Sequence, residues 1–219
     1  MRWMQGRVAA TILGLLLLAQ AAAALARQTD GTAAPAQAPT QAQACGNPAP
    51  GPGDPALPPR ISDETVQKIL AIPKGSRPDP VSYVPADTMR AHLAQFAYGA
   101  SFLTTQAGLD KFGRELLGRP DNSQFVMAKW GMDKVVASAN GSTACLELAL
   151  GLPAGAWKGQ RIVRIDIAVP GALNLRMPSG NEGGANADWI PGGRLPSGHL
   201  ESVVNQIPKG QYTESLLWP

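Results

Sequence analysis

Cysteine and histidine are scarce in this chain of 219 residues, which has two of each. Cys45, Cys145, His92 and His199 lie far apart, so none of them forms a pair at the short spacing that zinc sites use. The chain also lacks a G-x-S-x-G nucleophile elbow, a P-loop, an H-E-x-x-H motif and a G-x-G-x-x-G turn after a strand. We therefore expect no metal site, and no familiar catalytic motif assigns a function.

Long apolar runs are also scarce, and the one that is present lies at the start of the chain. The stretch 8–18 is apolar, follows two basic residues and leads to small residues that end in Ala24-Leu25-Ala26. This order is typical of a cleavable secretory signal peptide over residues 1–26. The run is shorter than a permanent membrane anchor needs, and no later stretch reaches about 18 apolar residues. We expect a secreted or periplasmic protein with no membrane segment after cleavage.

The chain has no large excess of either charge. It carries 19 Lys and Arg against 16 Asp and Glu. Arg2 and Arg7 lie in the predicted signal, which has no acidic residue, so the mature chain would carry 17 basic against 16 acidic residues, a net charge of +1. Proteins that bind nucleic acid through its phosphates are usually strongly basic. We therefore expect no nucleic-acid partner.

Large apolar side chains are almost missing from residues 27–59, which are mainly Ala, Pro, Gln, Gly and Thr. Such a segment cannot bury enough surface to offset the entropy lost on ordering, so we expect a disordered, Pro/Ala-rich spacer. The folded domain is expected over residues 60–219, a common domain size. Cys45 lies in the spacer, and it either forms a disulfide with Cys145 that ties the spacer to the domain or stays unpaired.

Within the domain, helical patterns come first and strand patterns later, which predicts an α+β fold. The clearest strand is 160–169, in which four apolar residues alternate with polar ones. We expect these four, Val163, Ile165, Ile167 and Val169, to face the core of a sheet that also contains 199–207. The other expected strands are 81–84, 100–103 and 173–177, and the expected helices are 62–71, one that follows Pro85, 105–117, 125–139 and 144–150.

A loop rich in Gly, Asn and Pro over 178–198 separates the last two expected strands, and long loops of this kind are usually functional. It contains Trp189 and a pair of glycines, and Glu201 follows it at the start of a strand. Composition alone favours an exposed strand-end charge at Glu201, with a carboxylate placed for function as the alternative. His92 is expected on the surface of a helix.

Three short segments, in their order and spacing, resemble the bacterial ADP-ribosyltransferase toxins of the pertussis and cholera type. Val81–Pro85 is similar to the family's opening strand. Ser101–Gln106 is similar to its aromatic-x-Ser-Thr-Ser strand end, and Glu201–Lys209 to the strand with the catalytic glutamate. Trp189–Gly193 resembles a loop of toxin-type NAD glycohydrolases. The resemblance covers about residues 80–219.

This resemblance implies an ADP-ribosyltransferase-like core with a split β-sheet, and NAD as substrate. It implies catalytic roles for Glu201 and for His199, which stands two residues earlier where the family has Glu or Gln. Ser82 stands where the family has an NAD-binding arginine, so Arg77 or Arg90 could take that role, or the role could be missing. The residues that would contact NAD are Tyr83, Phe102, Thr104, Thr105, Trp189 and Arg90.

The chemistry of NAD cleavage suits a carboxylate at Glu201. Breaking the nicotinamide–ribose bond passes through an oxocarbenium-like state, which glycosidases stabilise with carboxylates and with hydrogen bonds to the sugar. Phe102 or Tyr83 could stack on nicotinamide, while Thr104 and Thr105 could hold the cofactor or cap the following helix.

The sequence therefore predicts a secreted, toxin-like enzyme that cleaves NAD and transfers ADP-ribose to an unknown protein acceptor, with an antidote protein as a further candidate partner. An NAD glycohydrolase of the same fold, a secreted nuclease and a non-enzymatic interaction module are the alternatives.

Overall fold

The computed structural model describes residues 45–46 and 54–218. The predicted signal peptide over 1–26 and most of the predicted spacer therefore lie outside the described residues. None of the helices in the described part of the chain is long and apolar enough to cross a membrane.

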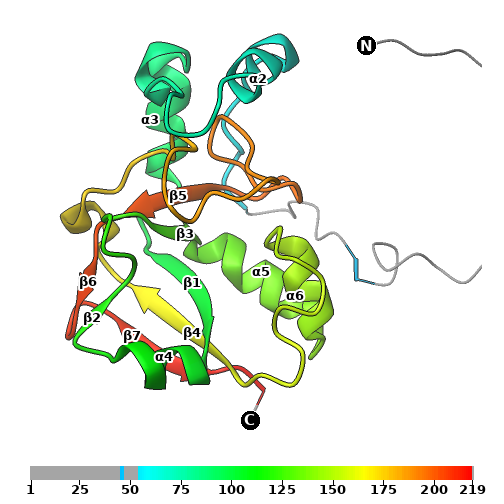
Figure 1. Cartoon of the computed structure of the whole chain (residues 1–219), viewed down its shortest axis with the longest axis vertical. Helices are drawn as coiled ribbons and strands as arrows, with labels where there is room; N and C mark the ends of the chain where they lie inside the picture. The colour runs from blue at the N-terminus through cyan, green and yellow to red at the C-terminus, as the bar shows by residue number, and fades with distance from the viewer. Residues whose placement is uncertain (1–44, 47–53, 219) are drawn as a thin grey trace, which may run out of the picture. The chain divides into compact units, whose positions relative to one another are not determined.

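In chain order (Figure 1), the elements are α2 (Asp63–Leu70), η1 (Pro80–Ser82), α3 (Ala86–Ala94), β1 (Ala100–Thr105), α4 (Gln106–Phe112), β2 (Leu116–Leu117), β3 (Gln124–Ala128), α5 (Lys129–Ala139), α6 (Thr143–Ala149), β4 (Ile162–Ile167), η2 (Pro170–Leu173), β5 (Glu201–Val204), β6 (Ile207–Pro208) and β7 (Thr213–Leu216).

Five of the strands form one antiparallel sheet in the order β5-β3-β1-β4-β7, and β2 pairs with β6. This mixture of helices and antiparallel strands confirms the predicted α+β class. β4 and β5 belong to the same sheet, as predicted. Val163, Ile165 and Ile167 are buried as expected, whereas Val169 lies beyond the end of β4 and is 66% exposed.

The central strand β1 pairs very unequally with its two neighbours. All six of its residues are in register with β4. β3 is in register with β1 only at Ala100↔Ala128 and Ser101↔Met127 among the described residues. Beyond Ser101 the two strands part, while β3 continues beside β5 (Figure 1). The sheet is therefore open between β1 and β3.

Apolar side chains cover both faces of the sheet. On one face, Phe96, Phe102 and Ile165 belong to a cluster that extends to α4. On the other face, Leu103 packs with Val135 in a cluster under α5 and α6. Successive residues of a strand point to opposite faces, which explains why neighbouring residues of β1 serve different clusters.

The predicted helix over 125–139 is wrong in its first part. Gln124–Ala128 forms β3, and the helix begins only after it. A short apolar run has no periodicity that distinguishes a buried strand from a buried helix, and here pairing with β5 decides. The predicted helix over 105–117 ends at Phe112, because Gly113 adopts a left-handed φ of 86°.

Two predicted strands are also absent from the described structure. The segment 81–84 lies instead around the 3-10 turn η1, because the Asp79 carboxylate caps this turn and Pro80 fits its first position. The segment 173–177 makes a single antiparallel bridge, between Arg176 and β5.

Residues 54–59, which the sequence assigns to the spacer, contact the domain. Leu57 packs against the first core cluster, and Pro58 is buried with its carbonyl accepting a hydrogen bond from Arg194 at 2.5 Å. The contacts of the domain therefore begin before the predicted boundary at residue 60.

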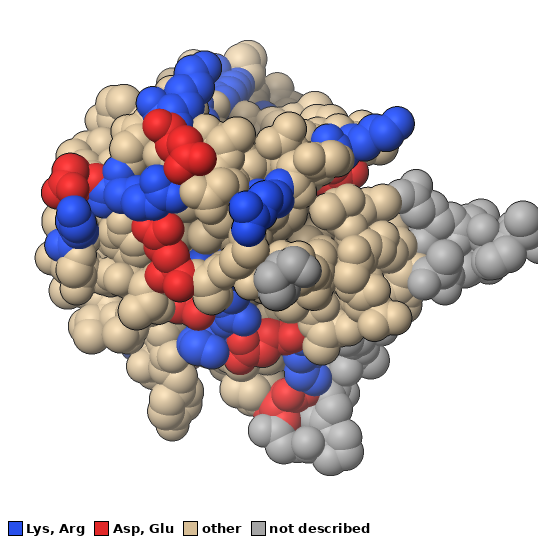
Figure 2. Space-filling model, turned by 90° about the horizontal axis from the view of Figure 1, so that it is seen from below, with Lys and Arg blue, Asp and Glu red and all other residues tan. Residues whose placement is uncertain are grey.

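Charged side chains on the surface are mixed in sign. Figure 2 shows basic and acidic groups adjoining one another on the face seen from below. Among the ion pairs of the described structure, Arg114 pairs with Asp110 and with Glu214 at 3.0 Å each, and so joins α4 to β7. The face in Figure 2 thus carries neighbouring charges of both signs rather than one extended patch.

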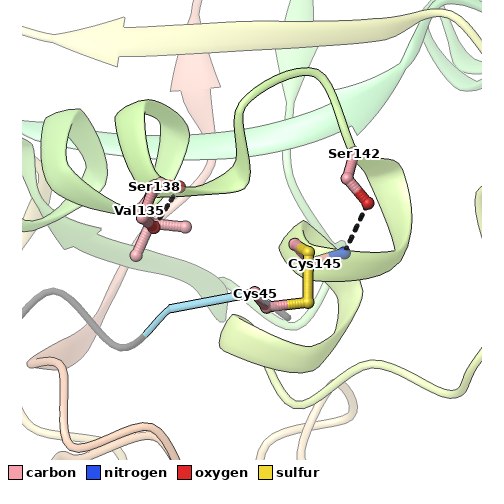
Figure 3. The surroundings of a disulfide bond; sticks show 5 residues. All are labelled: Cys45, Val135, Ser138, Ser142 and Cys145. Atoms are coloured by element: carbon pink, nitrogen blue, oxygen red, sulfur yellow. Dashed lines mark hydrogen bonds between the residues drawn. A yellow bond between two sulfur atoms is a disulfide. The ribbon is translucent and has the colours of Figure 1, made fainter. Parts of the chain in front are cut away.

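The two cysteines form a disulfide (Figure 3). Cys145 lies in the first turn of α6, where its main-chain N–H donates to the capping Ser142 hydroxyl at 3.3 Å. The bond attaches Cys45, 100 residues earlier, to this helix. Of the two alternatives left open by the sequence, the structure shows the disulfide.

Removing this bond with the double substitution Cys45→Ser and Cys145→Ser should lower the free energy of unfolding. The disulfide closes a loop of 100 residues in the unfolded chain, for which the chain-entropy model gives about 4–5 kcal/mol. Urea unfolding measures the change, and a reductant should destabilise the wild type but not the variant. Equal midpoints for the oxidised wild type and the variant would show that the bond does not stabilise the fold.

Candidate functional site

A cleft lies where β1 and β3 part. It consists of two adjoining hollows of about 120 and 230 Å³, both lined by Phe125, Gly184 and Glu201. Residues of β1 and β3 line the second hollow, and the loops 150–157 and 184–196 form the remaining walls. The opening in the sheet thus becomes a concave surface whose walls come from segments far apart in the sequence.

Glu201 stands at the start of β5, opposite Met127 of β3. Burial raises the pKa of its carboxyl from 4.5 to about 8, and the nearby charge of Glu182 contributes in the same direction. Glu201 is therefore mainly protonated at neutral pH in the free protein. The prediction from composition, that Glu201 is an exposed charge at the end of a strand, is therefore wrong. A carboxyl with so large a pKa shift, facing a cleft, is a candidate for function.

Aromatic residues line much of the cleft. Phe102 and Phe125 come from β1 and β3, Trp157 from the loop before β4 and Trp189 from the loop before β5. Phe102 also packs in the first core cluster. Trp189 is 5% exposed, so its indole forms a fixed part of the wall.

Arg77 holds Trp189 in place. Its guanidinium carbon lies 4.7 Å from the centre of the indole, a cation–π contact. Its Nη1 donates to Gly180 O at 2.9 Å and its Nε to Ile72 O at 3.2 Å. Gly180 has a φ of 83°, and a Cβ there would lie 2.5 Å from the indole. Arg77 therefore uses its donors on main-chain carbonyls and acts as a support for Trp189.

Buried polar groups also fix the two loops. The Glu147 carboxylate is 3% exposed and accepts from the main-chain N–H groups of Gly155, at 2.7 Å, and Trp157. Asn186 Nδ2 donates to Gly151 O at 2.9 Å, which links the two loops. The walls of the cleft are therefore held by hydrogen bonds as well as by apolar contacts.

Two arginines give the cleft positive charge. Arg194 lines the first hollow, is 7% exposed, and donates to the carbonyls of Pro58 and Gly198. Within the described residues it has no carboxylate at ion-pair distance, and burial and the charge of Arg60 lower its pKa. Arg119 lines the second hollow and is exposed. An anionic ligand would therefore find two cations in the cleft.

The structure brings together three of the predicted site residues: Glu201, Phe102 and Trp189 line one cleft. The other predicted NAD contacts are not among its lining residues in the described structure. Thr105 caps α4 by accepting from Gly108 N at 3.0 Å. Thr104 lies beside it at the far end of β1, three residues beyond Ser101.

Tyr83 and Arg90 also lie outside the cleft lining. Arg90 is exposed on α3 and pairs with Asp87. Tyr83 is half-buried after η1, and its hydroxyl has no hydrogen-bond partner among the described residues. Burial, with the charges of Asp79 and Glu182, raises the pKa of Tyr83 to about 12.

His199, predicted as catalytic, is buried under α5 rather than in the cleft lining. It is 8% exposed, and its Nδ1 lies 3.8 Å from the position that a Cβ on Gly131 would occupy. Burial and the charge of Lys134 lower its pKa. Its Nε2 has no hydrogen-bond partner within the described part of the chain.

Sequence reasoning missed several residues that the fold places at the site. Phe125, Trp157, Arg119 and Arg194 line the cleft from four separate segments, and no linear motif connects them. His92, expected on a helix surface, is instead 1% exposed. The approach of distant segments, which creates this site, leaves no signal in a single sequence.

A larger cavity of about 820 Å³ lies elsewhere, between the end of β4 and the start of β7. Tyr98, Val169 and Tyr212 line it, and the one carboxylate among its described lining residues, Asp166, is already paired with Arg164 at 2.8 Å. In residues 45–46 and 54–218, no group of three or more His, Cys, Asp or Glu side chains could hold a metal ion. The cleft at Glu201 is therefore the better candidate site.

No protein-family model matches the chain, and no curated protein matches it either. The geometry of the cleft is therefore the only basis for assigning a function to the described residues.

Replacing Glu201 by Gln should stabilise the protein increasingly as the pH rises from about 4.5 to about 8. In this window the unfolded wild type has lost a proton that the folded protein keeps, so rising pH favours unfolding. Glutamine does not titrate. Above about pH 8 both states of the wild type are ionised, so the difference should become constant.

Urea unfolding at stepped pH measures this effect. Glu64→Gln is the control for the amide exchange itself, because Glu64 is exposed on α2 and pairs only with Lys68 in the described structure. A difference between Glu201→Gln and wild type that does not vary with pH would contradict burial of the Glu201 carboxyl.

Proposed function

We propose that the cleft binds NAD and that Glu201 promotes cleavage of the nicotinamide–ribose bond, with transfer of ADP-ribose to a protein acceptor. The observation that carries this proposal is the position of Glu201. Its side chain is half-buried and its carboxyl desolvated at the point where β1 and β3 part, in a cleft lined by aromatic residues. Water exclusion strengthens the effect of a carboxylate on a developing positive charge.

The reaction would proceed as follows. The bond between ribose C1′ and the nicotinamide nitrogen breaks, and its electron pair leaves with neutral nicotinamide. The ribose then carries an oxocarbenium-like charge, which the Glu201 carboxylate stabilises. A nucleophile adds to C1′ and loses its proton to solvent.

The charge of NAD itself would prepare Glu201 for this role. The nicotinamide ring of NAD is cationic, and an opposite charge nearby lowers the pKa of a carboxyl. NAD binding would therefore ionise the carboxyl that is mainly protonated in the free protein. Phe125 and Trp189 offer rings for stacking, and Arg119 and Arg194 offer donors for phosphate oxygens.

The architecture supports the resemblance to ADP-ribosyltransferases in one respect and departs from it in another. The opening between β1 and β3, one strand away from the strand of Glu201, is compatible with the split sheet that the resemblance implies. The segment at Tyr83 is not a strand, and the arginines of the cleft come from other positions. The Cys45–Cys145 disulfide supports a location outside the cytoplasm, as expected for a toxin-like secreted enzyme with an antidote partner.

An NAD glycohydrolase is the second candidate, and the position of His199 favours it. His199, to which the resemblance gives a catalytic role, is here buried under α5 and outside the cleft lining. The two loops of the cleft are also linked by the hydrogen bond from Asn186 to Gly151, which would limit how far they part to admit a protein side chain. Water would then be the nucleophile, and free ADP-ribose the product.

Glu201→Gln should lower the rate of nicotinamide release from NAD by a factor on the order of 10²–10³, the scale of losing one preorganised transition-state contact. Chromatography of nicotinamide with the mature protein and NAD measures this rate. Glu64→Gln should retain wild-type turnover. Release that survives in Glu201→Gln would assign the chemistry to another residue.

The same assay separates the remaining functions. Labelled ADP-ribose that becomes attached to an added protein identifies a transferase, and free ADP-ribose a glycohydrolase. If the wild type releases no nicotinamide with or without candidate acceptor proteins, the enzyme proposal fails and a non-enzymatic interaction module is favoured.

Arg119→Gln should raise the KM for NAD by about 10- to 100-fold, since a hydrogen bond to a charged group contributes about 1.5–3 kcal/mol. Its exposure means that the fold should tolerate the change. Arg90→Gln is the matched comparison, because sequence resemblance assigns NAD contact to Arg90 while the structure places it outside the cleft lining. An increase in KM for Arg90→Gln but not for Arg119→Gln would locate the NAD site away from this cleft.

A further inference from the structure

The main chain of Glu201 is held from both sides. Its N–H donates to Gly193 O at 2.9 Å. Its carbonyl lies 3.1 Å from Nε2 of His92, and the same nitrogen lies 2.9 Å from the Ser202 hydroxyl. His92 belongs to α3 and is 1% exposed, so these contacts are shielded from water. The first residue of β5 is therefore fixed by groups from two other segments.

The surroundings of the His92 ring favour one of its tautomers. A carbonyl oxygen can only accept, so the contact with Glu201 O is a hydrogen bond in the tautomer whose Nε2 carries the proton, and this tautomer leaves no unpaired N–H at Nδ1. Nδ1 is buried and has no hydrogen-bond partner among the described residues. Protonation there would place an unpaired N–H and a positive charge in the interior, close to Arg194. Burial accordingly lowers the pKa of His92 to about 4, and the charge of Arg194 acts in the same direction.

Gly193 completes this arrangement because only glycine fits there. Its φ is 67°, and a Cβ would lie 2.6 Å from His92 Cε1 and 2.9 Å from Glu201 O. The loop after Trp189 therefore passes directly over the imidazole and the Glu201 carbonyl. Any side chain at this position would displace one of these groups.

We propose that His92 is a positioning residue for Glu201: through its Nε2 it holds the start of β5 so that the Glu201 carboxyl stays in the cleft. This inference rests on the proposed function of Glu201. His92 does not itself line the cleft in the described structure, so its role is to act through the main chain of its neighbour. The simple alternative is a core histidine that contributes only to stability.

The comparison of His92→Gln with His92→Leu separates these roles. A glutamine amide can donate as Nε2 does, whereas leucine fills similar space without a donor. In His92→Leu, kcat for nicotinamide release should fall by a factor on the order of 10–10², the scale of a small misplacement of a reacting group, with KM within about twofold. His92→Gln should recover most of this loss. The rate of each variant is divided by its folded fraction, which near-ultraviolet circular dichroism measures.

A second readout does not depend on turnover. Carbon NMR of protein with labelled glutamate carboxyls follows the titration of Glu201, assigned by the signal lost in Glu201→Gln. The wild type should titrate near pH 8. His92→Leu should titrate lower, because a loosened strand start lets water reach the carboxyl, and His92→Gln should stay close to wild type. The other charged groups around this carboxyl, Glu182, Asp188, Arg119 and Arg194, are unchanged in both variants.

The outcomes distinguish this inference from the proposed function. If the wild type releases no nicotinamide, the proposed function fails. The NMR comparison then still tests whether His92 fixes the main chain at Glu201 and so keeps the carboxyl buried. If His92→Leu leaves the Glu201 titration and any kcat unchanged, His92 is not a positioning residue. If kcat falls as much in His92→Gln as in His92→Leu, the proposal is also overturned. The hydrogen-bond donor at Nε2 would then not be what positions Glu201.

Discussion

Keeping the Glu201 carboxyl away from water raises its pKa to about 8, and such a shift is unfavourable for folding wherever the unfolded chain would ionise. The fold must therefore hold this group in place against its tendency to reach solvent. It does so through the main chain, because the N–H and carbonyl of Glu201 are bonded to Gly193 and His92. Side chains at functional sites commonly lower the stability of the fold in this way.

The walls of the cleft are also fixed through main-chain groups. There, buried polar side chains hold irregular loops that have no strand pairing. Glu147 fixes the loop before β4, and Arg77 fixes the loop that carries Trp189. Arg194 extends this support to the N-terminal segment through Pro58 O. The site consequently depends on residues from the start of the domain as well as on its C-terminal third. This explains why a domain boundary drawn at residue 60 leaves out a segment that contacts the cleft wall.

The parts of the fold that the sequence could predict are those with a clear local pattern. The alternation around Ile165 identified β4, and the loop 178–198 preceded a strand that begins with Glu201, as expected. β3 could not be recognised, because Phe125 and its apolar neighbours suit a buried helix as well as a buried strand. Its identity depends on pairing with β5, which is a long-range contact.

The site was predictable to a similar extent. Glu201, Trp189 and Phe102 could be selected because short segments around them resemble known motifs. Arg119 and Arg194 could not, because nothing near them in the sequence shows which side chains the fold brings together. His92 illustrates the opposite error, since a polar residue on a short helix suggested a surface position and the structure buries it against β5.

A crystal structure of Glu201→Gln with bound NAD tests the central claim most directly, because the variant should bind NAD but cleave it slowly. The nicotinamide riboside should lie beside residue 201 in the opening between β1 and β3, with a phosphate within hydrogen-bond distance of Arg119 or Arg194. NAD bound instead in the cavity lined by Tyr98 and Tyr212, or a cleft left empty at saturating NAD, would contradict the assignment of this site.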